Sequence, residues 1–250
     1  MTRFMLCGLL LWLTLAAATP VRADPAEDQA VQFVEKKLFG LVTRAENQPG
    51  KPVIGVSLGL GQVTEADLKE LTAFKNLTSL TIIRSQVTNG GLKELAKLTN
   101  LTRLSLSDNY VTDGGLKELA KLTNLTSLHL NESGVSGDGL KELVTLKKLT
   151  SLKLMDTKVS GTGLKELAAL KNLTELDLTG SKISDNGLSE LTELASLAKL
   201  RLYKTQVTDA GLKELAKLKN LTNLDLEKTQ VTDAGVKELQ SALPKCKIVR

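Results

Sequence analysis

A regular alternation of leucine and polar residues runs through most of the chain. From Val53 onward, the sequence divides without a gap into eight units of 24 residues, which together span residues 53–244. Each unit opens with L-x-x-L-x-L, in which leucines alternate with other residues as they do in a strand with one buried face. Most units continue with V-T-D-x-G-L-K-E-L or a close variant, whose apolar residues recur at helical spacing. The pattern therefore predicts one strand and one helix per unit.

The third unit illustrates how each helix is expected to begin. Thr112 is a good N-cap, and Asp113 follows in the first turn, where the helix dipole favours an anion. Val111 is expected to pack against Leu116, and Gly115 to permit a close approach of helix to strand. At the ninth position of seven units a short polar side chain recurs, which we expect to bond to the backbone of the turn after the strand. These residues are Ser85, Asn109, Ser133, Thr157, Ser181, Thr205 and Thr229.

The repeated motif resembles that of the leucine-rich-repeat family. The seventh and eighth units read LAKLRLYKTQVTDAGLKELAKLKN and LTNLDLEKTQVTDAGVKELQSALP. They are similar to the ribonuclease-inhibitor-like and cysteine-containing subtypes, and most of all to the short TDAGLKEL repeats of planctomycete bacterial proteins. The resemblance covers residues 53–250. It implies an α/β horseshoe-shaped solenoid, with a parallel β-sheet on the concave face and helices on the convex face, so that stacked units share one core.

The regions outside the repeats have separate predicted roles. Residues 1–23 read as a secretory signal peptide, because Arg3 precedes a short apolar run and small residues surround a cleavage site near Ala23. A retained N-terminal anchor is the alternative. The run is shorter than a stable membrane span requires. We expect residues 24–52 to form an N-terminal helical cap, with Val31, Val34, Leu38 and Leu41 at helical spacing and an edge segment near Leu41–Arg44.

At the other end, residues 245–250 are expected to form a C-terminal capping strand. Leu243, Cys246 and Ile248 repeat L-x-x-L-x-L, which places Cys246 in a buried leucine position. A reactive thiol is the alternative reading. After signal cleavage, this is the one remaining cysteine, so the mature chain cannot form an internal disulfide. The predicted location of the mature chain is periplasmic or secreted.

Composition and motifs argue against catalysis and against nucleic-acid binding. The net charge is +5, but lysine and glutamate alternate along the helices, as is typical of a solvated face rather than a basic patch. An aromatic content of 3% disfavours a base-stacking or carbohydrate surface. His129 is the single histidine, and Asp113, Asp209 and Asp233 recur through the repeat rather than as an acid–base pair. We therefore expect no enzyme activity, cofactor or metal.

The outward strand positions differ from unit to unit, whereas the inward leucines hardly change. These positions form an acidic–basic–acidic band centred on Tyr203, and tyrosine and arginine are favoured where proteins bind each other. The alternatives are that neighbouring charges only stabilise the sheet, or that the face has drifted without a partner. The candidate partner-binding residues are Arg103, His129, Lys153, Met155, Glu175, Asp177, Lys199, Arg201, Tyr203, Asp225 and Glu227.

The sequence thus predicts an exported, monomeric, non-enzymatic scaffold that binds a protein partner through its concave face. Two other functions stay open. One is a passive structural protein of the cell envelope. The other is an inhibitor of a secreted hydrolase, which rests on analogy of fold alone.

Overall fold

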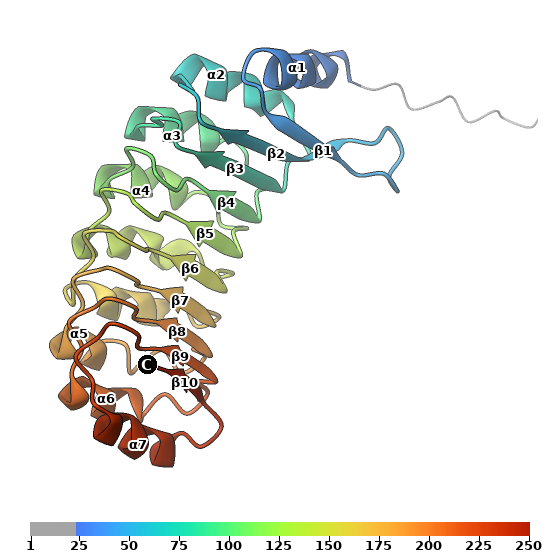
Figure 1. Cartoon of the computed structure of the whole chain (residues 1–250). Coiled ribbons are helices and arrows are strands. Elements are labelled where there is room, and N and C mark those ends of the chain that lie inside the picture. Colours follow the sequence, from blue (N-terminus) through green and yellow to red (C-terminus); the bar gives the residue numbers. More distant parts are fainter. Residues whose placement is uncertain (1–23) are drawn as a thin grey trace, which may run out of the picture.

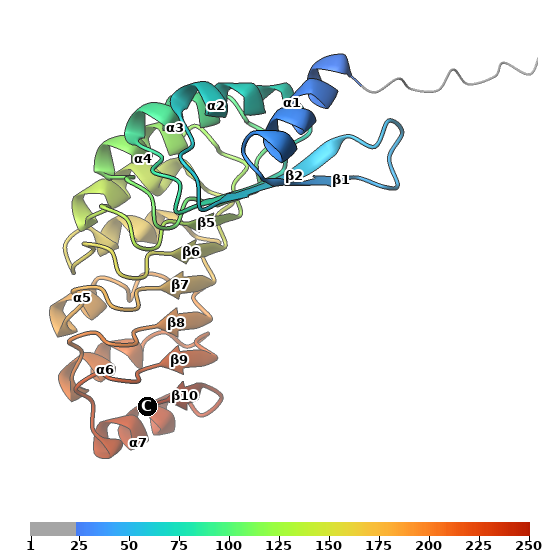
Figure 2. The same cartoon turned by 45° about the horizontal axis from the view of Figure 1, so that its top comes forward.

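Strands recur along the chain at 24-residue intervals and pair in their sequence order. The computed structural model describes residues 24–250; the predicted signal segment, residues 1–23, lies outside them. Ten strands form one sheet in the order β1 to β10, in which β1 and β2 are antiparallel and every later pair is parallel. The sheet lines the inner side of an arc, and the helices follow its outer side (Figures 1 and 2). The predicted α/β solenoid is confirmed.

The elements alternate regularly after the first helix. The strands are β1 (Leu41–Arg44), β2 (Val53–Gly59), β3 (Ser79–Ile83), β4 (Arg103–Ser105), β5 (Ser127–His129), β6 (Ser151–Lys153), β7 (Glu175–Asp177), β8 (Lys199–Arg201), β9 (Asn223–Asp225) and β10 (Lys247–Val249). The α-helices are α1 (Pro25–Lys36), α2 (Glu65–Glu70), α3 (Asn89–Leu95), α4 (Asp113–Leu119), α5 (Asp185–Ser189), α6 (Asp209–Leu215) and α7 (Asp233–Ala242). Three 3-10 segments complete the set: η1 (Leu71–Ala73), η2 (Gly137–Thr145) and η3 (Leu164–Ala169).

The register of the sheet follows the repeat. Leu80 pairs with Leu104, which pairs with Leu128, and this offset of one unit continues to Leu224. Equivalent leucines therefore stack in columns inside the arc, where they are almost fully buried. Since burying one leucine contributes about 1.5–3 kcal/mol, this continuous column holds the solenoid together without any crosslink.

The N-terminal cap is tied to the sheet by a buried carboxylate. Glu27 on α1 accepts hydrogen bonds from the Val53 N–H, at 3.0 Å, and from Arg44, at 3.3 Å. The helix ends at Lys36, so the prediction that Leu41 continues its apolar stripe is wrong. Leu41 lies on β1, the edge segment that the sequence predicted near Leu41–Arg44. The chain turns at Phe39, whose φ is +51°, and then passes Gly40, where a Cβ atom would lie only 2.4 Å from the Leu58 side chain.

In the outer layer, a series of hydrogen bonds joins each of several units to the next, and we name this series the carboxylate ladder. Asp113 accepts hydrogen bonds from the backbone N–H and the hydroxyl of Ser136, each at 2.7 Å. Asp185 binds Thr208 in the same two-pronged way, and Asp209 binds Thr232. In the second unit Asn89 takes the place of the aspartate and bonds to Thr112. Each rung thus joins position 13 of one unit to position 12 of the next.

The ladder corrects two expectations about the third unit. Thr112 does begin the helix, but its side chain makes no capping bond and pairs with Asn89 instead. Gly115 does not serve the approach of helix to strand. A Cβ atom there would lie 2.5 Å from the Asn89 Oδ1 atom and 2.6 Å from the Leu92 side chain. The glycine therefore makes room for the preceding unit.

The fourth and fifth units depart from the predicted α-helix. Their outer segments are the 3-10 segments η2 and η3. Both units carry glycine at position 13, Gly137 and Gly161, where most other units carry a ladder residue. Gly163 begins η3 with a φ of +86°, a conformation that favours glycine. The number of glycines does not distinguish these units, because α3 and α4 also carry two glycines in their first turn; η2 and η3 differ from them in lacking the ladder residue at position 13.

Polar residues at position nine largely behave as predicted. The hydroxyls of Thr157 and Thr205 each donate to the carbonyl three residues earlier, at 2.7 Å. Asn109 bonds to backbone groups on both sides of its turn. Ser133 is the exception within residues 24–250, since its buried hydroxyl has no hydrogen-bond partner.

The C-terminal strand forms in a different register from the predicted one. Ile248 pairs with Leu224, the fourth position of the unit, whereas the sequence motif placed it at the sixth. The strand keeps the 24-residue offset of the other parallel pairs, so the L-x-x-L-x-L match that begins at Leu243 lies two residues away from the structural register. Cys246 is buried and unpaired, as predicted for a leucine substitute. Burial raises the pKa of its thiol, which disfavours the reactive thiolate.

Candidate partner-binding face

The concave side of the sheet gathers the predicted site residues. Positions three and five of each strand face away from the core, and the register aligns them between units. His129 thus lies between Ser105 and Lys153, and Arg201 lies between Asp177 and Asp225. Eight of the eleven candidate residues are on strands β4 to β9. The other three, Met155, Tyr203 and Glu227, follow their strands in the adjoining turns.

One arginine of the basic band pairs with two acidic residues of the neighbouring strand. Arg201 on β8 makes ion pairs with Glu175 at 3.2 Å and with Asp177 at 3.4 Å, both on β7. Asp177 is buried, and it also accepts a hydrogen bond from the Thr179 N–H. Pairs of this kind contribute at most about 1 kcal/mol when solvent reaches them. Their arrangement favours the alternative that these charges stabilise neighbouring strands.

Tyr203 is engaged within the chain as well. The Lys228 ammonium lies 5.0 Å from the centroid of the tyrosine ring, at the distance of a cation–π contact. The ring itself is half-buried. A partner would therefore meet Tyr203 together with Lys228, while Lys199 on β8 extends freely into solvent.

His129 lies half-buried in the middle of the face. Its Nε2 atom is 3.2 Å from the Ser127 hydroxyl. Burial, and to a lesser degree the nearby Lys153 ammonium, lower the pKa of the imidazole below 6.5, while Glu175 and Asp177 oppose that change. The side chain is consequently a neutral polar group at pH 7. Arg103 and Met155 make only polar contacts with neighbouring strands, to Ser79 and, through the Met155 N–H, to Asn131.

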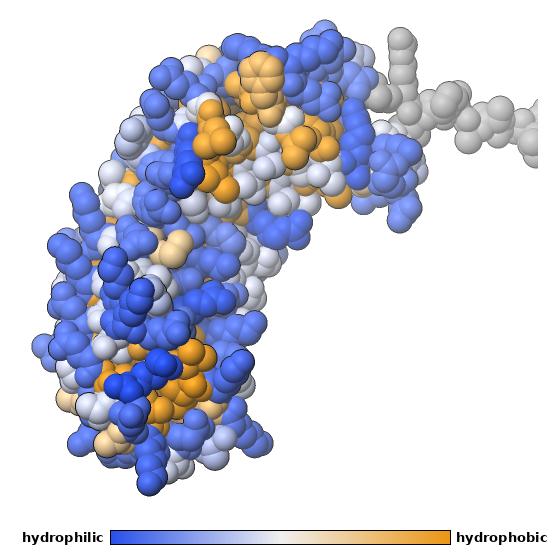
Figure 3. Space-filling view, in the orientation of Figure 1, coloured by the Kyte–Doolittle hydropathy of each residue, from blue (hydrophilic) through white to orange (hydrophobic). Residues whose placement is uncertain are grey.

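A second feature of the concave face was not among the predicted residues. Phe39, Leu41, Leu60 and Ile83 are exposed by 85%, 74%, 82% and 38% respectively. We name these four the N-terminal apolar patch. Figure 3 shows apolar side chains gathered at this end of the molecule, around β1, β2 and β3.

Strand pairing explains why these residues lie on one surface. Leu41 on β1 pairs with Ser57, and Ile83 on β3 pairs with Gly59, so both flank the concave side of β2. The N–H of Leu60, directly after β2, donates to the Ile83 carbonyl at 3.2 Å. The small residues Ser57 and Gly59 form a low floor between larger apolar side chains. Such a shape suits a protruding apolar group of another molecule.

Two residues of the patch have an unusual backbone. Phe39 has a φ of +51° and Leu60 a φ of +57°. Leu60 is the eighth residue of its unit, and this left-handed turn recurs at position eight in every unit, with polar residues or glycine in the other seven. A left-handed conformation costs a leucine about 1–2 kcal/mol. An exposed leucine at a strained position therefore adds nothing to folding, which points to a role in binding.

Sequence reasoning missed the patch because half of it lies outside the repeats. Phe39 and Leu41 precede the first unit, and β1 joins the sheet antiparallel, so the 24-residue register does not extend to it. Leu60 and Ile83 lie inside the repeats, but the repeat pattern does not show that they come close to Phe39 and Leu41. The available signal was the single apolar residue at position eight.

Other kinds of site find little support in the part of the chain that the structure describes. Residues 24–250 contain no group of three or more histidine, cysteine or acidic side chains suited to hold a metal ion. Among these residues, too, no helix combines the length and the apolar character that crossing a membrane requires.

Comparisons with known proteins agree with the repeat. Five segments match the Leucine Rich repeat family model, residues 97–120, 121–144, 145–168, 169–191 and 217–239. The chain is therefore built from leucine-rich repeats. Among solved structures it is similar to internalin C2 from Listeria monocytogenes, at 23% identity and a TM-score of 0.55, over 90% of this chain and 93% of that one. This likeness concerns the fold. None of the curated proteins compared with the chain matches it.

Proposed function

We propose that this protein is a non-enzymatic scaffold that binds a protein partner through its concave face, anchored at the N-terminal apolar patch. The observation that carries the proposal is the exposure of Phe39, Leu41 and Leu60 on one surface. Leucine-rich-repeat proteins typically bind other proteins. Large, contiguous apolar surfaces on a soluble protein commonly mark such contacts.

The patch supplies the apolar centre of an interface, and charged residues supply its rim. The Arg84–Asp108 ion pair, at 2.7 Å, lies beside Leu60 at position eight of the next two units. Burying a leucine side chain in a partner contributes about 1.5–3 kcal/mol. Residues 155–228, where Arg201 is paired with Glu175 and Asp177, would act as a polar extension that sets orientation rather than affinity.

The same proposal includes export of the chain and a monomeric state. Residues 1–23 have the charge and apolar pattern of a secretory signal, which favours a periplasmic or secreted location. We further infer from the TDAGLKEL motif that the repeats are of the ribonuclease-inhibitor-like or cysteine-containing type, similar to those of planctomycete bacterial proteins. The interleaved charges disfavour nucleic acid, and we expect the mature chain to be a monomer.

A passive structural role in the cell envelope is the second candidate. The observation that favours it is the internal pairing of Arg201 with Glu175 and Asp177, which engages three charges of that band within the sheet. High abundance without a dissociable partner would support it against the binding proposal.

Leu60→Asn separates binding from folding. Asparagine tolerates the left-handed conformation better than leucine, so the variant should unfold at an equal or higher temperature. The affinity for the partner should nevertheless fall by about tenfold or more, because one leucine buried in the interface is lost. A photo-crosslinker at position 41 measures how much partner is captured.

Glu132→Asn is the matched control, since it changes the same left-handed backbone position three units away from the patch. It should leave capture nearly unchanged, as should Tyr110→Ser at an exposed residue outside the patch. Equal capture by Leu60→Asn and the original chain would reject the patch as the anchor. Loss of capture only in Tyr203→Ala and Arg201→Glu would move the site to residues 155–228.

A further inference from the structure

The concave face carries a cavity at the opposite end from the N-terminal apolar patch. The cavity, of about 270 Å³, lies over β8, β9 and β10, where Lys199, Asn223 and Lys247 line it. The register places these three residues side by side, because Asn223 pairs with Lys199 on one side and with Lys247 on the other. We name them the basic row. Since neighbouring strands are about 4.8 Å apart, the backbones of the two lysines are about 10 Å apart, and both side chains can reach a group between them.

The two lysines of the basic row have their charge available to a ligand. Both are exposed, and among the residues that the structure describes neither ammonium group makes an ion pair. Glu175, the neighbour of Lys199 on β7, binds Arg201 at 3.2 Å instead. Two like charges repel each other, so an anion between the lysines would be stabilised by both of them.

The other lining residues determine where in the cavity an anion would lie. The Asn223 Oδ1 atom accepts a hydrogen bond from the Thr222 hydroxyl at 3.0 Å, and within residues 24–250 the amide nitrogen of Asn223 has no partner, so it can donate to a ligand. Asp225, two residues later on β9, repels an anion from that side of the cavity. Val249 pairs with Asp225 in the register and is 39% exposed, which provides an apolar contact next to the basic row.

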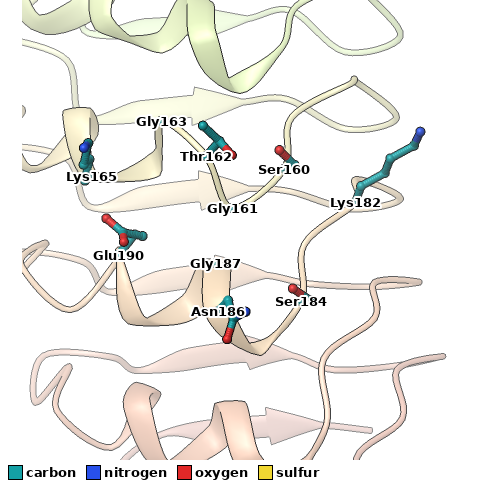
Figure 4. Close-up of a pocket in the computed structure, with 10 residues that line it drawn as sticks. All are labelled: Ser160, Gly161, Thr162, Gly163, Lys165, Lys182, Ser184, Asn186, Gly187 and Glu190. Atoms are coloured by element: carbon teal, nitrogen blue, oxygen red, sulfur yellow. The ribbon is translucent and has the colours of Figure 1, made fainter.

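A cavity on the outer layer does not concentrate charge in this way. It has a volume of about 460 Å³ and lies between Gly161 and Gly187 (Figure 4). In Figure 4, Lys165 and Glu190 lie together on its helical side, while Lys182 extends outward from the loop. The positive charge is therefore partly balanced there, and we place no ligand in this cavity.

The composition of the basic row favours an acidic peptide over a nucleic acid. No aromatic side chain lines the cavity over β8 to β10, so it lacks the stacking surface that binds single-stranded nucleic acid. A carboxylate side chain requires only the two ammonium groups and the amide donor. An apolar side chain next to it in the same peptide could pack against Val249.

We propose that the basic row binds a carboxylate of an acidic segment of the protein partner. This inference rests on the proposed function, because it takes the partner to lie along the concave face. Leu60 follows the strand of the first unit and Asn223 lies on that of the eighth, so about seven strand spacings, or about 34 Å along the sheet, separate the apolar patch from the basic row. The partner therefore presents an apolar group and an acidic segment at a comparable separation.

A short acidic peptide tests the proposal through the backbone ¹⁵N–¹H resonances of the full chain. Acetylated and amidated tetraglutamate, at low and constant ionic strength, should shift the amides of Asn223 and Lys247 in a saturable manner. Tetraglutamine, which has the same length without the charges, should not shift them. The dissociation constant should rise as sodium chloride is added, because salt screens exposed charges.

Two double variants separate the basic row from the net charge of the chain. Lys199→Gln with Lys247→Gln should weaken tetraglutamate binding by about fivefold or more, as expected for the loss of two solvent-exposed ion pairs. Lys213→Gln with Lys237→Gln is the matched control, since it removes the same charge from α6 and α7 on the outer side, and it should leave the binding unchanged. Equal weakening in both double variants, or shifts that tetraglutamine reproduces, would overturn the proposal.

Two further measurements distinguish this proposal from the rival ligand and from the proposed function. Tighter binding of a tetrathymidylate than of tetraglutamate at the basic row would assign it to nucleic acid and reject the acidic peptide. Leu60→Asn should leave tetraglutamate binding unchanged, because the apolar patch lies at the other end of the sheet. Absence of tetraglutamate binding together with normal partner capture would reject the basic row and leave the apolar patch in place. Saturable tetraglutamate binding would support the basic row even if capture showed that the apolar patch is not the anchor.

Discussion

The same residue type takes different roles in this chain according to its position in the unit. Asp113 lies in a first helical turn, yet its carboxylate is used to hold the next unit through Ser136. Asp177, on a strand, is buried and pairs with Arg201 and with the Thr179 N–H. The sequence indicated where these residues lie but not what they bind, because both partners come from distant positions that only the stacking of units brings near.

His129 provides a residue-scale prediction that a single resonance can follow. Its pKa should lie below 6.5, because burial and Lys153 disfavour the imidazolium. Lys153→Gln should raise that pKa, and Glu175→Gln should lower it further. A proton titration by NMR reads the value directly, since His129 is the one histidine in the chain.

The lowered pKa of His129 also determines how the free energy of unfolding changes with pH. Below pH 6.5 the unfolded chain binds a proton more readily than the folded chain, so the free energy of unfolding should fall as the pH falls through this window. His129→Gln should remove that part of the pH dependence. An imidazole pKa at or above 6.5 in the folded chain would contradict the assignment.

At the scale of elements, the inward leucines were sufficient to place the strands. L-x-x-L-x-L fixed β3 to β9 because each leucine has one possible face when the sheet is buried on that side. The outer segments were less predictable. Two expected α-helices are the 3-10 segments η2 and η3, in the units whose position 13 is Gly137 or Gly161, and β10 lies two residues from its predicted register because it keeps the 24-residue offset of the other strands. These outcomes depend on neighbouring units, which local periodicity does not describe.

The ladder allows an element-scale prediction about how units are joined. Asp113→Ala should lower the free energy of unfolding by about 1 kcal/mol, because two charge-assisted hydrogen bonds to Ser136 are lost at a partly exposed site. Asp113→Asn should keep most of the stability, since Asn89 already forms such a rung. Chemical denaturation measures both. Equal losses in the two variants would show that the rung depends on charge rather than on geometry.

At the scale of the whole molecule, the fold was predictable from repetition, whereas the candidate interface was only partly so. The concave columns followed from the register of Leu80, Leu104 and their equivalents. The N-terminal apolar patch did not, because Phe39 and Leu41 belong to a cap that has no second copy in the chain to compare with.

The interrupted ladder predicts where the solenoid opens first. Units four to six lack the rungs between them, so their outer segments are not joined by the two hydrogen bonds that join those of units seven and eight. Hydrogen exchange at equivalent strand residues should therefore show less protection for Leu152 and Leu176 than for Leu104 and Leu200. Uniform protection across these four amides would mean that the leucine core alone sets the opening energy.

Every rung of the ladder points the same way, and this direction has a consequence at the C-terminal end. Asp233 occupies the rung position of the eighth unit, and Arg250 donates to its carboxylate while also donating to the Val231 carbonyl at 2.8 Å. The arginine thus acts like the end group of a polymer. Replacing residues 245–250 with a further 24-residue unit that carries threonine at position 12 would give Asp233 a regular ladder partner. Each added unit would lengthen the sheet by about 4.8 Å.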